Sequence, residues 1–300
     1  MGRPDSPENL LERLAAQAER AHAQYGDAVD PQRSLAARRA VQGFLSDRLD
    51  EITGAAAAAG PARTWTTGSP VFTFWNGPVD DAPALVRSCI ARLRRIHPDA
   101  IVLDGRSLRE HVDIPPHIAA RLESAHPAHF SDYARVALLE RHGGVWVDAT
   151  VFAAAPVHET LAPLMDEGVL YPRWSGRQIS NWLIAAAPAH PVIALQRAAL
   201  DVWWRERDDL PDYFLYHRIF ESLLSLVPDA RRIWRRVPFF GSLPAHLLQV
   251  AMYRPWDARE MAFVLEAAPL QKLSYKYDPD SVPPGSVLAR LEADLPLEGP

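Results

Sequence analysis

The segment from residue 129 to residue 152, HFSDYARVALLERHGGVWVDATVF, constrains the fold of this chain more than any other segment. Its first part has apolar residues at the three-and-four spacing of a packed helical face, namely Phe130, Tyr133, Ala134, Ala137 and Leu138. Ser131 and Asp132 are placed to accept hydrogen bonds from the first turn of that helix. Gly143 and Gly144 then end it, because glycine adopts the left-handed conformation that follows many helix C-termini. The pattern predicts a helix that stops at a double glycine.

A short strand follows the glycines and ends on a carboxylate. Val145, Trp146 and Val147 favour β structure and lead directly to Asp148. Ligands of open α/β sheets bind beyond the carboxyl ends of the strands, so Asp148 is the strongest candidate for a functional residue. On spacing alone, a single acid at a strand end is more often a helix cap or a buried hydrogen-bond acceptor.

The residues before this segment predict a βαβ unit. Residues 71–75 (VFTFW) form a β-type run closed by Asn-Gly-Pro, residues 81–97 have helical spacing, and residues 100–103 form a second buried-type strand. Such a unit implies parallel strands and a right-handed crossover, and therefore a Rossmann-like α/β fold. Further strands are expected over residues 169–171 and 181–187. Further helices are expected over residues 114–123, 191–205, 212–226, 244–252 and 257–267.

The chain divides into three parts by composition. Residues 1–68 form a helical extension with a linker, residues 69–280 carry the alternating strands and helices, and residues 281–300 form a Pro-rich, acidic tail with the composition of a disordered segment. Within the extension we expect two amphipathic helices and an Ala-rich linker, over residues 9–23, 34–49 and 54–68. The extension could be a packed cap, a dimerisation hairpin or an acceptor-binding addition.

Charge, cysteine content and hydropathy exclude several classes of protein. The formal net charge is -5, so we expect no nucleic-acid partner. Cys89 is the only cysteine, which excludes an internal disulfide and a Cys-based zinc cluster and favours a reducing, cytoplasmic setting. The first 20 residues lack the apolar core of a signal peptide, and no segment has the roughly 20 uninterrupted apolar residues of a spanning helix. Any membrane contact is expected to be peripheral, at the inner face.

The combination S-D-Y-A-R, a helix, and then G-G-V-W-V-D-A-T resembles the sugar-binding region with the DXD motif of a set of glycosyltransferases. The set includes bacterial capsular polysaccharide synthesis proteins, fungal α-mannosyltransferases and the glucosylating domains of clostridial toxins. The D-A-T ending is most similar to the capsular group. The similarity extends over about residues 70–276, through VFTFWNGP, IVLDGRSLREHVDIP and ISNWLIAAAPAHP. It implies a GT-A fold with a mixed, mainly parallel central sheet, and a glycosyltransferase that uses a nucleoside diphosphate sugar.

The resemblance also implies roles for individual residues. Asp132 matches the acid that binds ribose or sugar hydroxyls, and Arg135 matches an arginine that contacts the donor. Asp148 matches the first acid of the DXD motif, which contacts the ribose or a divalent ion, Mn²⁺ or Mg²⁺. Trp75 matches the aromatic residue that stacks on the base of the donor, and a UDP-sugar is favoured over a GDP-sugar as that donor. The resemblance places Asn181 near the transferred sugar. Each has a purely structural alternative: Trp75 as core, Arg135 as a partner of Asp132, and Asn181 as a turn residue.

Two positions bear on the charge of the diphosphate. Thr150 stands where the second acid of the motif is expected, so the metal site predicted at Asp148 and Thr150 has one carboxylate and one weaker, neutral ligand. Lys272 lies in QKLSYK, which is similar to the K-L segment that ends the domain in the capsular group. It is a candidate contact for the leaving diphosphate, and the competing interpretation is an exposed strand with solvated lysines.

Arginine clusters permit two interpretations. They are most simply solvated helix faces, and the alternative is contact with the phosphates of a lipid-linked acceptor at the membrane surface. The residues concerned are Arg92, Arg94, Arg95, Arg231, Arg232, Arg235 and Arg236.

These observations predict a glycosyltransferase that acts with retention on a glycan or lipid-linked acceptor in bacterial capsular or surface polysaccharide synthesis. The alternative is a catalytically silent relative that binds a sugar nucleotide or scaffolds a biosynthetic complex, which Thr150 and the helical extension suggest. A glycan hydrolase is a third hypothesis, but the sequence nominates no second pair of carboxylates for it.

Overall fold

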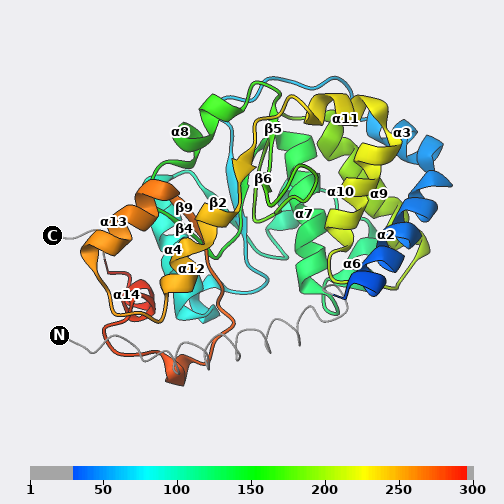
Figure 1. The fold of residues 1–300 in the computed structure, drawn as a ribbon. Helices are drawn as coiled ribbons and strands as arrows, with labels where there is room; N and C mark the ends of the chain where they lie inside the picture. Colours follow the sequence, from blue (N-terminus) through cyan, green and yellow to red (C-terminus); the bar gives the residue numbers. More distant parts are fainter. Residues whose placement is uncertain (1–29, 296–300) are drawn as a thin grey trace.

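A five-stranded sheet forms the centre of the computed structural model, which describes residues 30–295 (Figure 1). Its strand order is β2-β1-β3-β7-β5. The strands are β1 (Val71–Phe74), β2 (Ile101–Leu103), β3 (Gly144–Val147), β5 (Val169–Leu170) and β7 (Leu183–Ala186). β1 runs parallel to β2 and β3, whereas β7 runs antiparallel to β3 and β5. The predicted α/β fold with a mixed, mainly parallel sheet is confirmed.

The predicted βαβ unit consists of β1, helix α4 (Ala84–Ile96) and β2. The two strands pair in parallel with Phe74 opposite Leu103. All four residues of β1 are buried, as expected of a strand whose sheet is covered on both faces. The next strand along the sheet, β3, pairs with β1 on its other edge. This places the ends of β1 and β3 beside each other.

The double glycine joins helix α7 (Pro127–His142) to β3, as predicted. Gly143 has φ +65° and Gly144 has φ +100°, which residues with a side chain rarely adopt. A Cβ atom on Gly144 would lie 2.2 Å from the backbone oxygen of Pro70, just before β1. That oxygen accepts a hydrogen bond from the N–H of Val145 at 2.8 Å. The close pairing of β3 with the start of β1 therefore requires glycine.

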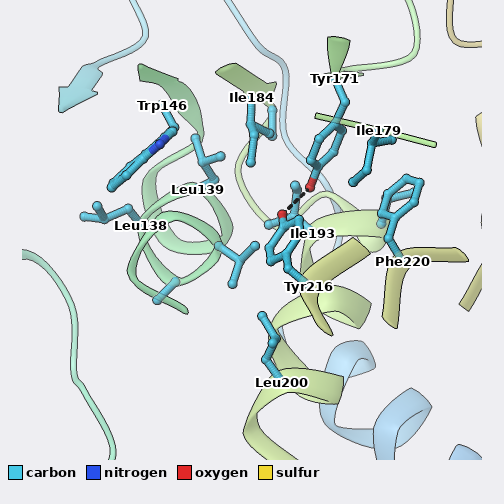
Figure 2. Close-up of a cluster of buried hydrophobic side chains, with 14 of the residues drawn as sticks. Leu138, Leu139, Trp146, Tyr171, Ile179, Ile184, Ile193, Leu200, Tyr216 and Phe220 are labelled. Carbon is cyan, nitrogen blue, oxygen red and sulfur yellow. Dashed lines mark hydrogen bonds between the residues drawn. The ribbon is translucent and has the colours of Figure 1, made fainter. Parts of the chain in front are cut away.

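Helix α7 packs on β3 and β7, α9 (Pro191–Glu206) packs on α7, and α10 (Leu215–Leu226) packs on α9. Figure 2 shows the apolar core, in which Leu138 and Leu139 of α7 lie beside Trp146 of β3. The hydroxyls of Tyr171 and Tyr216 are 3.0 Å apart in this core and satisfy each other. The helix expected over residues 212–226 is α10, which begins at Leu215 and is mostly buried.

A second layer lies on the other side of the sheet. It contains α4, α12 (Leu247–Ala251), α13 (Ala258–Ala267) and α14 (Val287–Glu292), grouped at the left in Figure 1. β4 (Val151–Ala153) and β9 (Leu270–Lys272) form an antiparallel pair beside them. α14 packs on α4 and buries Val287, Leu288 and Leu291. The expectation of disorder is therefore wrong for residues 287–292, because their apolar side chains pack against the rest of the fold.

Helices α2 (Pro31–Ser46) and α3 (Leu49–Ala57) belong to the N-terminal part. α2 packs on α10 and α3 packs on α9, so both are joined to the main core. The helix expected over residues 34–49 is α2, which begins and ends three residues earlier, and α3 makes the first residues of the expected linker helical. The helix expected over residues 9–23 lies outside the described residues. The division into extension, domain and tail stays a prediction.

The remaining elements are short. They are α5 (Leu108–His111), α6 (Pro116–Leu122), α8 (Val157–Leu161), α11 (Pro228–Trp234), β6 (Pro172–Arg173) and β8 (Phe240–Gly241). β8 pairs with β6 in parallel. Among residues 30–295, no helix combines the length and the apolar character needed to span a bilayer.

Candidate active site

The candidate site lies at one edge of the sheet, where the carboxyl ends of β1 and β3 meet the amino end of β7. Parallel strands end at the same edge, and an antiparallel neighbour begins there. Trp75 follows β1, Asp148 follows β3, and Asn181 precedes β7. The N–H of Asp148 donates to the carbonyl of Trp182 at 2.8 Å, which ties the ends of β3 and β7 together.

Helix α7 runs back along the sheet, so its first half reaches the same edge. Nη2 of Arg135 lies 3.4 Å from Oδ1 of Asp132 and 3.6 Å from Oδ1 of Asp148. Its Nη1 donates to the carbonyl of Asn181 at 2.5 Å, and its guanidinium lies 5.0 Å from the centre of the Trp146 ring. Burial lowers the pKa of Arg135, but the two carboxylates outweigh burial and raise it. Arg135 is therefore a permanently charged link between the two acids.

Asp132 is buried, and three side chains hold its carboxylate. Nδ2 of Asn181 donates to Oδ1 at 2.7 Å, Nδ1 of His129 lies 3.3 Å from Oδ2, and Arg135 completes the set. Burial by itself would raise the pKa of Asp132, yet the positive charge of Arg135 and the hydrogen bond from His129 hold it below its ordinary value. Asp132 is consequently ionised at neutral pH.

Ser131 and Asp132 do not cap α7, so that prediction is wrong. The helix begins at Pro127, whose ring suits a first turn because it has no N–H to satisfy. Ser131 instead accepts twice from Arg135, at its carbonyl from Nε (3.1 Å) and at its hydroxyl from Nη2 (3.0 Å). The apolar spacing begins at Phe130 and gave no sign of the turn before it.

Asp148 is partly exposed, with 22% of its side chain open to solvent. Nε1 of Trp146 donates to Oδ1 at 2.8 Å, and Nζ of Lys272 lies 3.2 Å from Oδ2. Trp146 can reach it because residues two apart in a strand point to the same face. The carboxylate is thus oriented by two side chains while it faces the open edge.

The pairing of β4 with β9 brings Lys272 to the site. Val151 lies opposite Lys272 in this ladder, so the lysine is beside Thr150, and its ammonium contacts Oγ1 of Thr150. Leu270 and Gln271 are buried. β9 is therefore not an exposed strand, and Lys272 has two protein partners. Its contact with a diphosphate stays a prediction.

Trp75 lies half-buried at the end of β1. It packs against an apolar cluster that includes Ala149, the residue after Asp148, and its ring meets Tyr275 edge to face at a centroid distance of 5.2 Å. Tyr275 follows β9, so the segment that carries Lys272 also shields Trp75. Stacking of Trp75 on a base stays a prediction. A base that stacks on Trp75 would either lie beside Tyr275 or displace it from the ring.

Sequence reasoning missed three side chains of this edge. His129 lies three residues before Asp132, and Trp146 lies two before Asp148; both spacings could have revealed them. His217 of α10 carried no such signal. Burial lowers its pKa to about 4 although Asp132 acts in the opposite direction, and its Nδ1 is buried without a hydrogen-bond partner in the described part of the chain.

The side chains at the predicted metal position do not fit a divalent ion. Asp148 supplies one carboxylate and Thr150 a neutral hydroxyl, and the ammonium of Lys272 contacts both. A positive charge against both ligands repels a second cation at short distance. Within residues 30–295 there is no group of three or more His, Cys, Asp and Glu side chains arranged to hold a metal ion.

The arginine clusters contain surface ion pairs. Arg95 pairs with Asp294 at 2.5 Å, and Arg236 pairs with Glu167 at 2.7 Å. These contacts agree with solvated helix faces. Contact of these residues with a lipid-linked acceptor stays a prediction.

Comparison with known proteins identifies the family of the chain. The sequence profile described as "Capsular polysaccharide synthesis protein" matches residues 29–291, which includes every residue of the site. No curated protein matches the chain. Among solved structures, a chain titled "PaToxG Glycosyltransferase" is similar, with 14% sequence identity and a TM-score of 0.37, over 69% of this chain and 84% of that one.

Proposed function

The chain belongs to the capsular polysaccharide synthesis protein family, and from this premise we propose that it is a glycosyltransferase. It would move a sugar from a nucleoside diphosphate sugar to a glycan or lipid-linked acceptor of capsular or surface polysaccharide synthesis. The observation that carries the proposal is the convergence of Asp132, Arg135, Asp148 and Asn181 at one sheet edge. Such an edge is where open α/β sheets bind ligands.

The proposed reaction replaces one bond of the anomeric carbon by another. The bond from this carbon to the β-phosphate oxygen breaks, and its electron pair stays on the diphosphate. A bond forms between the same carbon and an acceptor hydroxyl oxygen, whose proton passes to the departing diphosphate. Both events take place on one face of the sugar, which retains the configuration without a covalent enzyme intermediate. Positive groups already in place at the edge, such as Arg135, stabilise the charge that develops.

The proposed roles follow from exposure and bonding. Asp148 is the partly exposed acid and contacts ribose or sugar hydroxyls. Asp132 and Asn181 form a hydrogen-bonded pair at the same edge and position the transferred sugar. Trp75 stacks on the base, for which uracil is favoured over the larger guanine because Tyr275 already covers part of the ring.

A donor panel tests the proposal. The purified full chain is incubated with UDP- and GDP-sugars, once with MnCl₂ and once with EDTA, and released sugar is followed by proton NMR, which also reports the anomeric configuration. We expect slow hydrolysis of one donor, with the α- or β-configuration of that donor retained in the first product. Absence of both binding and hydrolysis across the panel would contradict the proposal.

Thr150 supports one alternative function: the protein would bind a sugar nucleotide without catalysing sugar transfer. Its neutral hydroxyl contacts Lys272 where the motif predicts a second acid. The same panel separates the two functions: a silent relative binds a nucleotide sugar in calorimetry and releases no sugar over many hours.

A further inference from the structure

We propose that Lys272 supplies the positive charge for the leaving diphosphate, so that this site works without a divalent ion. The ammonium, held between Asp148 and Thr150, is the group that contacts the diphosphate. This inference rests on the proposed use of a nucleoside diphosphate sugar. It concerns the same site and names the source of its cationic charge.

The contacts of the ammonium fix its place and leave one donor open. An ammonium has three N–H donors. One faces Oδ2 of Asp148 at 3.2 Å and another faces Oγ1 of Thr150. Among residues 30–295 the third has no partner, and 23% of the Lys272 side chain is exposed. A phosphate oxygen at the open edge would complete the set, with no protein contact to break.

Thr150 explains why an ammonium fits here. A hydroxyl carries no charge, so among the described residues Asp148 is the one anion paired with the ammonium and leaves it partly available to a ligand. With a second carboxylate at residue 150 the ammonium would be enclosed by two anions, and the pair would instead suit a hard cation with oxygen ligands. The threonine at position 150, in place of the second acid, therefore leaves Lys272 with a single counter-charge and free to bind an anionic ligand.

The use of lysine in this chain supports a specific role. Of the 32 lysine and arginine residues, only Lys272 and Lys276 are lysines. Every other basic side chain of the lysine or arginine type is an arginine. A planar guanidinium with a fixed fork does not replace a compact ammonium between a carboxylate and a hydroxyl. A site that needs such a point charge accounts for lysine at position 272.

The second lysine lies close to the first. Burial, and to a lesser extent the charge of Lys272, lower the pKa of Lys276, so the two ammonium groups are near enough to repel each other. In the part of the chain that the structure describes, Lys276 has no ion-pair partner. A diphosphate bound by Lys272 would relieve this repulsion.

Calorimetry with UDP, and GDP as a second probe, tests the inference on the full chain. We expect the same dissociation constant in excess EDTA and in excess MnCl₂. Lys272→Ala should weaken binding about 10- to 100-fold in both buffers, the range for a lost charged hydrogen bond. Arg259→Ala, which removes an exposed cation of α13, is the control and should bind as the wild type does, and Lys276→Ala should lose less than Lys272→Ala. Lys272→Arg should not restore the wild-type affinity.

A second experiment rebuilds the metal site that the geometry argues against. Binding of Mn²⁺ alone is followed by the electron paramagnetic resonance signal of the free ion. We expect no binding by the wild type. The Thr150→Asp/Lys272→Ala variant, with two carboxylates and no ammonium, should bind one equivalent and should bind UDP only with Mn²⁺. Thermal unfolding checks that each variant is folded, and Lys272→Gln replaces Lys272→Ala if the alanine variant unfolds.

The outcomes separate this inference from the proposed function. If wild-type protein needs Mn²⁺ to bind UDP or GDP, and Lys272→Ala binds as the wild type does, the inference is overturned while the proposed function stands. If neither nucleotide binds in either buffer, the proposed function fails and the inference fails with it. Nucleotide binding that ignores EDTA and depends on Lys272 supports both.

Discussion

One guanidinium nitrogen of Arg135 lies between two acids, 3.4 Å from Oδ1 of Asp132 and 3.6 Å from Oδ1 of Asp148. Asp132 comes from the first half of helix α7, and Asp148 directly follows strand β3. The arginine thus links a residue of the helix to a residue at the end of the strand. Its removal is expected to affect both folding and ligand binding.

Arg135→Ala should destabilise the fold strongly. Asp132 would remain buried without its main counter-charge, and removing one partner of a buried pair costs about 3–5 kcal/mol. Urea unfolding followed by tryptophan fluorescence measures the loss. The Asp132→Asn/Arg135→Ala double variant should recover part of it, since no buried charge is left. A loss below about 1 kcal/mol in the single variant would show that water screens this pair.

Asp148→Asn should abolish most activity and leave stability nearly unchanged. The amide keeps an oxygen for Nε1 of Trp146 but loses the charge that faces the open edge. We expect kcat/KM for the donor found in the panel to fall about 100-fold or more. The free energy of unfolding should change by less than about 1 kcal/mol, because the carboxylate is partly exposed. Asp80→Asn, an exposed acid before α4, is the control and should keep full activity.

Gly144→Ala should destabilise the sheet. The new Cβ would meet the backbone oxygen of Pro70 at 2.2 Å, and φ is +100°. Strain and overlap together predict a loss of about 3 kcal/mol or more. Gly43→Ala is the control: this glycine lies inside α2 with open space around it, so the substitution should stabilise by about 0.5–1 kcal/mol. Equal midpoints in chemical denaturation for the two variants would contradict the packing described at Pro70.

Stability should fall as the pH drops from about 6.5 towards 4. Burial lowers the pKa of His190 from 6.5 to about 4, so the unfolded chain binds a proton in this interval that the folded chain does not. The stabilisation is complete above the unfolded pKa and is lost as the pH falls towards the folded pKa. The loss from this residue should reach about 3 kcal/mol at pH 4. His190 is the N-cap of α9, where its Nδ1 accepts from the N–H of Val192 at 3.3 Å.

Free energies of unfolding measured at several pH values check this expectation. His190→Asn keeps a capping oxygen and does not titrate, so its stability should depend less steeply on pH than that of the wild type. His217, whose pKa burial also lowers to about 4, contributes in the same direction and stays in both proteins. Parallel pH curves for the two proteins would show that His190 is not a source of the slope.

The sequence predicted those parts of the fold that local signals decide. The double glycine and the run before Asp148 placed the end of α7 and the whole of β3, and the spacing over residues 81–97 placed α4. Long-range contacts decided what it missed. Residues 287–292 become helical because they have α4 to pack against, and two-residue β8 is a strand only through its pairing with β6.

For the site, sequence spacing and resemblance nominated Asp132, Arg135 and Asp148, and the structure brings the three together. The contact of Lys272 with Asp148 depends on the β4–β9 ladder between distant segments, which no local pattern reveals. His217 reaches Asp132 through the packing of α10, and its placement likewise comes from tertiary structure alone.

The presence of both lysines at one edge has a practical consequence for anyone handling this protein. Reagents that modify amines have, apart from the chain terminus, only Lys272 and Lys276 to react with. Coupling the protein to a sensor chip through its amines would therefore anchor part of it through Lys272, at the proposed diphosphate site, and block the ligand being measured. Reductive methylation with ¹³C-formaldehyde would instead be useful, because it places NMR labels on the two lysines and on the terminal amine alone. The label on Lys272 would then report ligand binding directly.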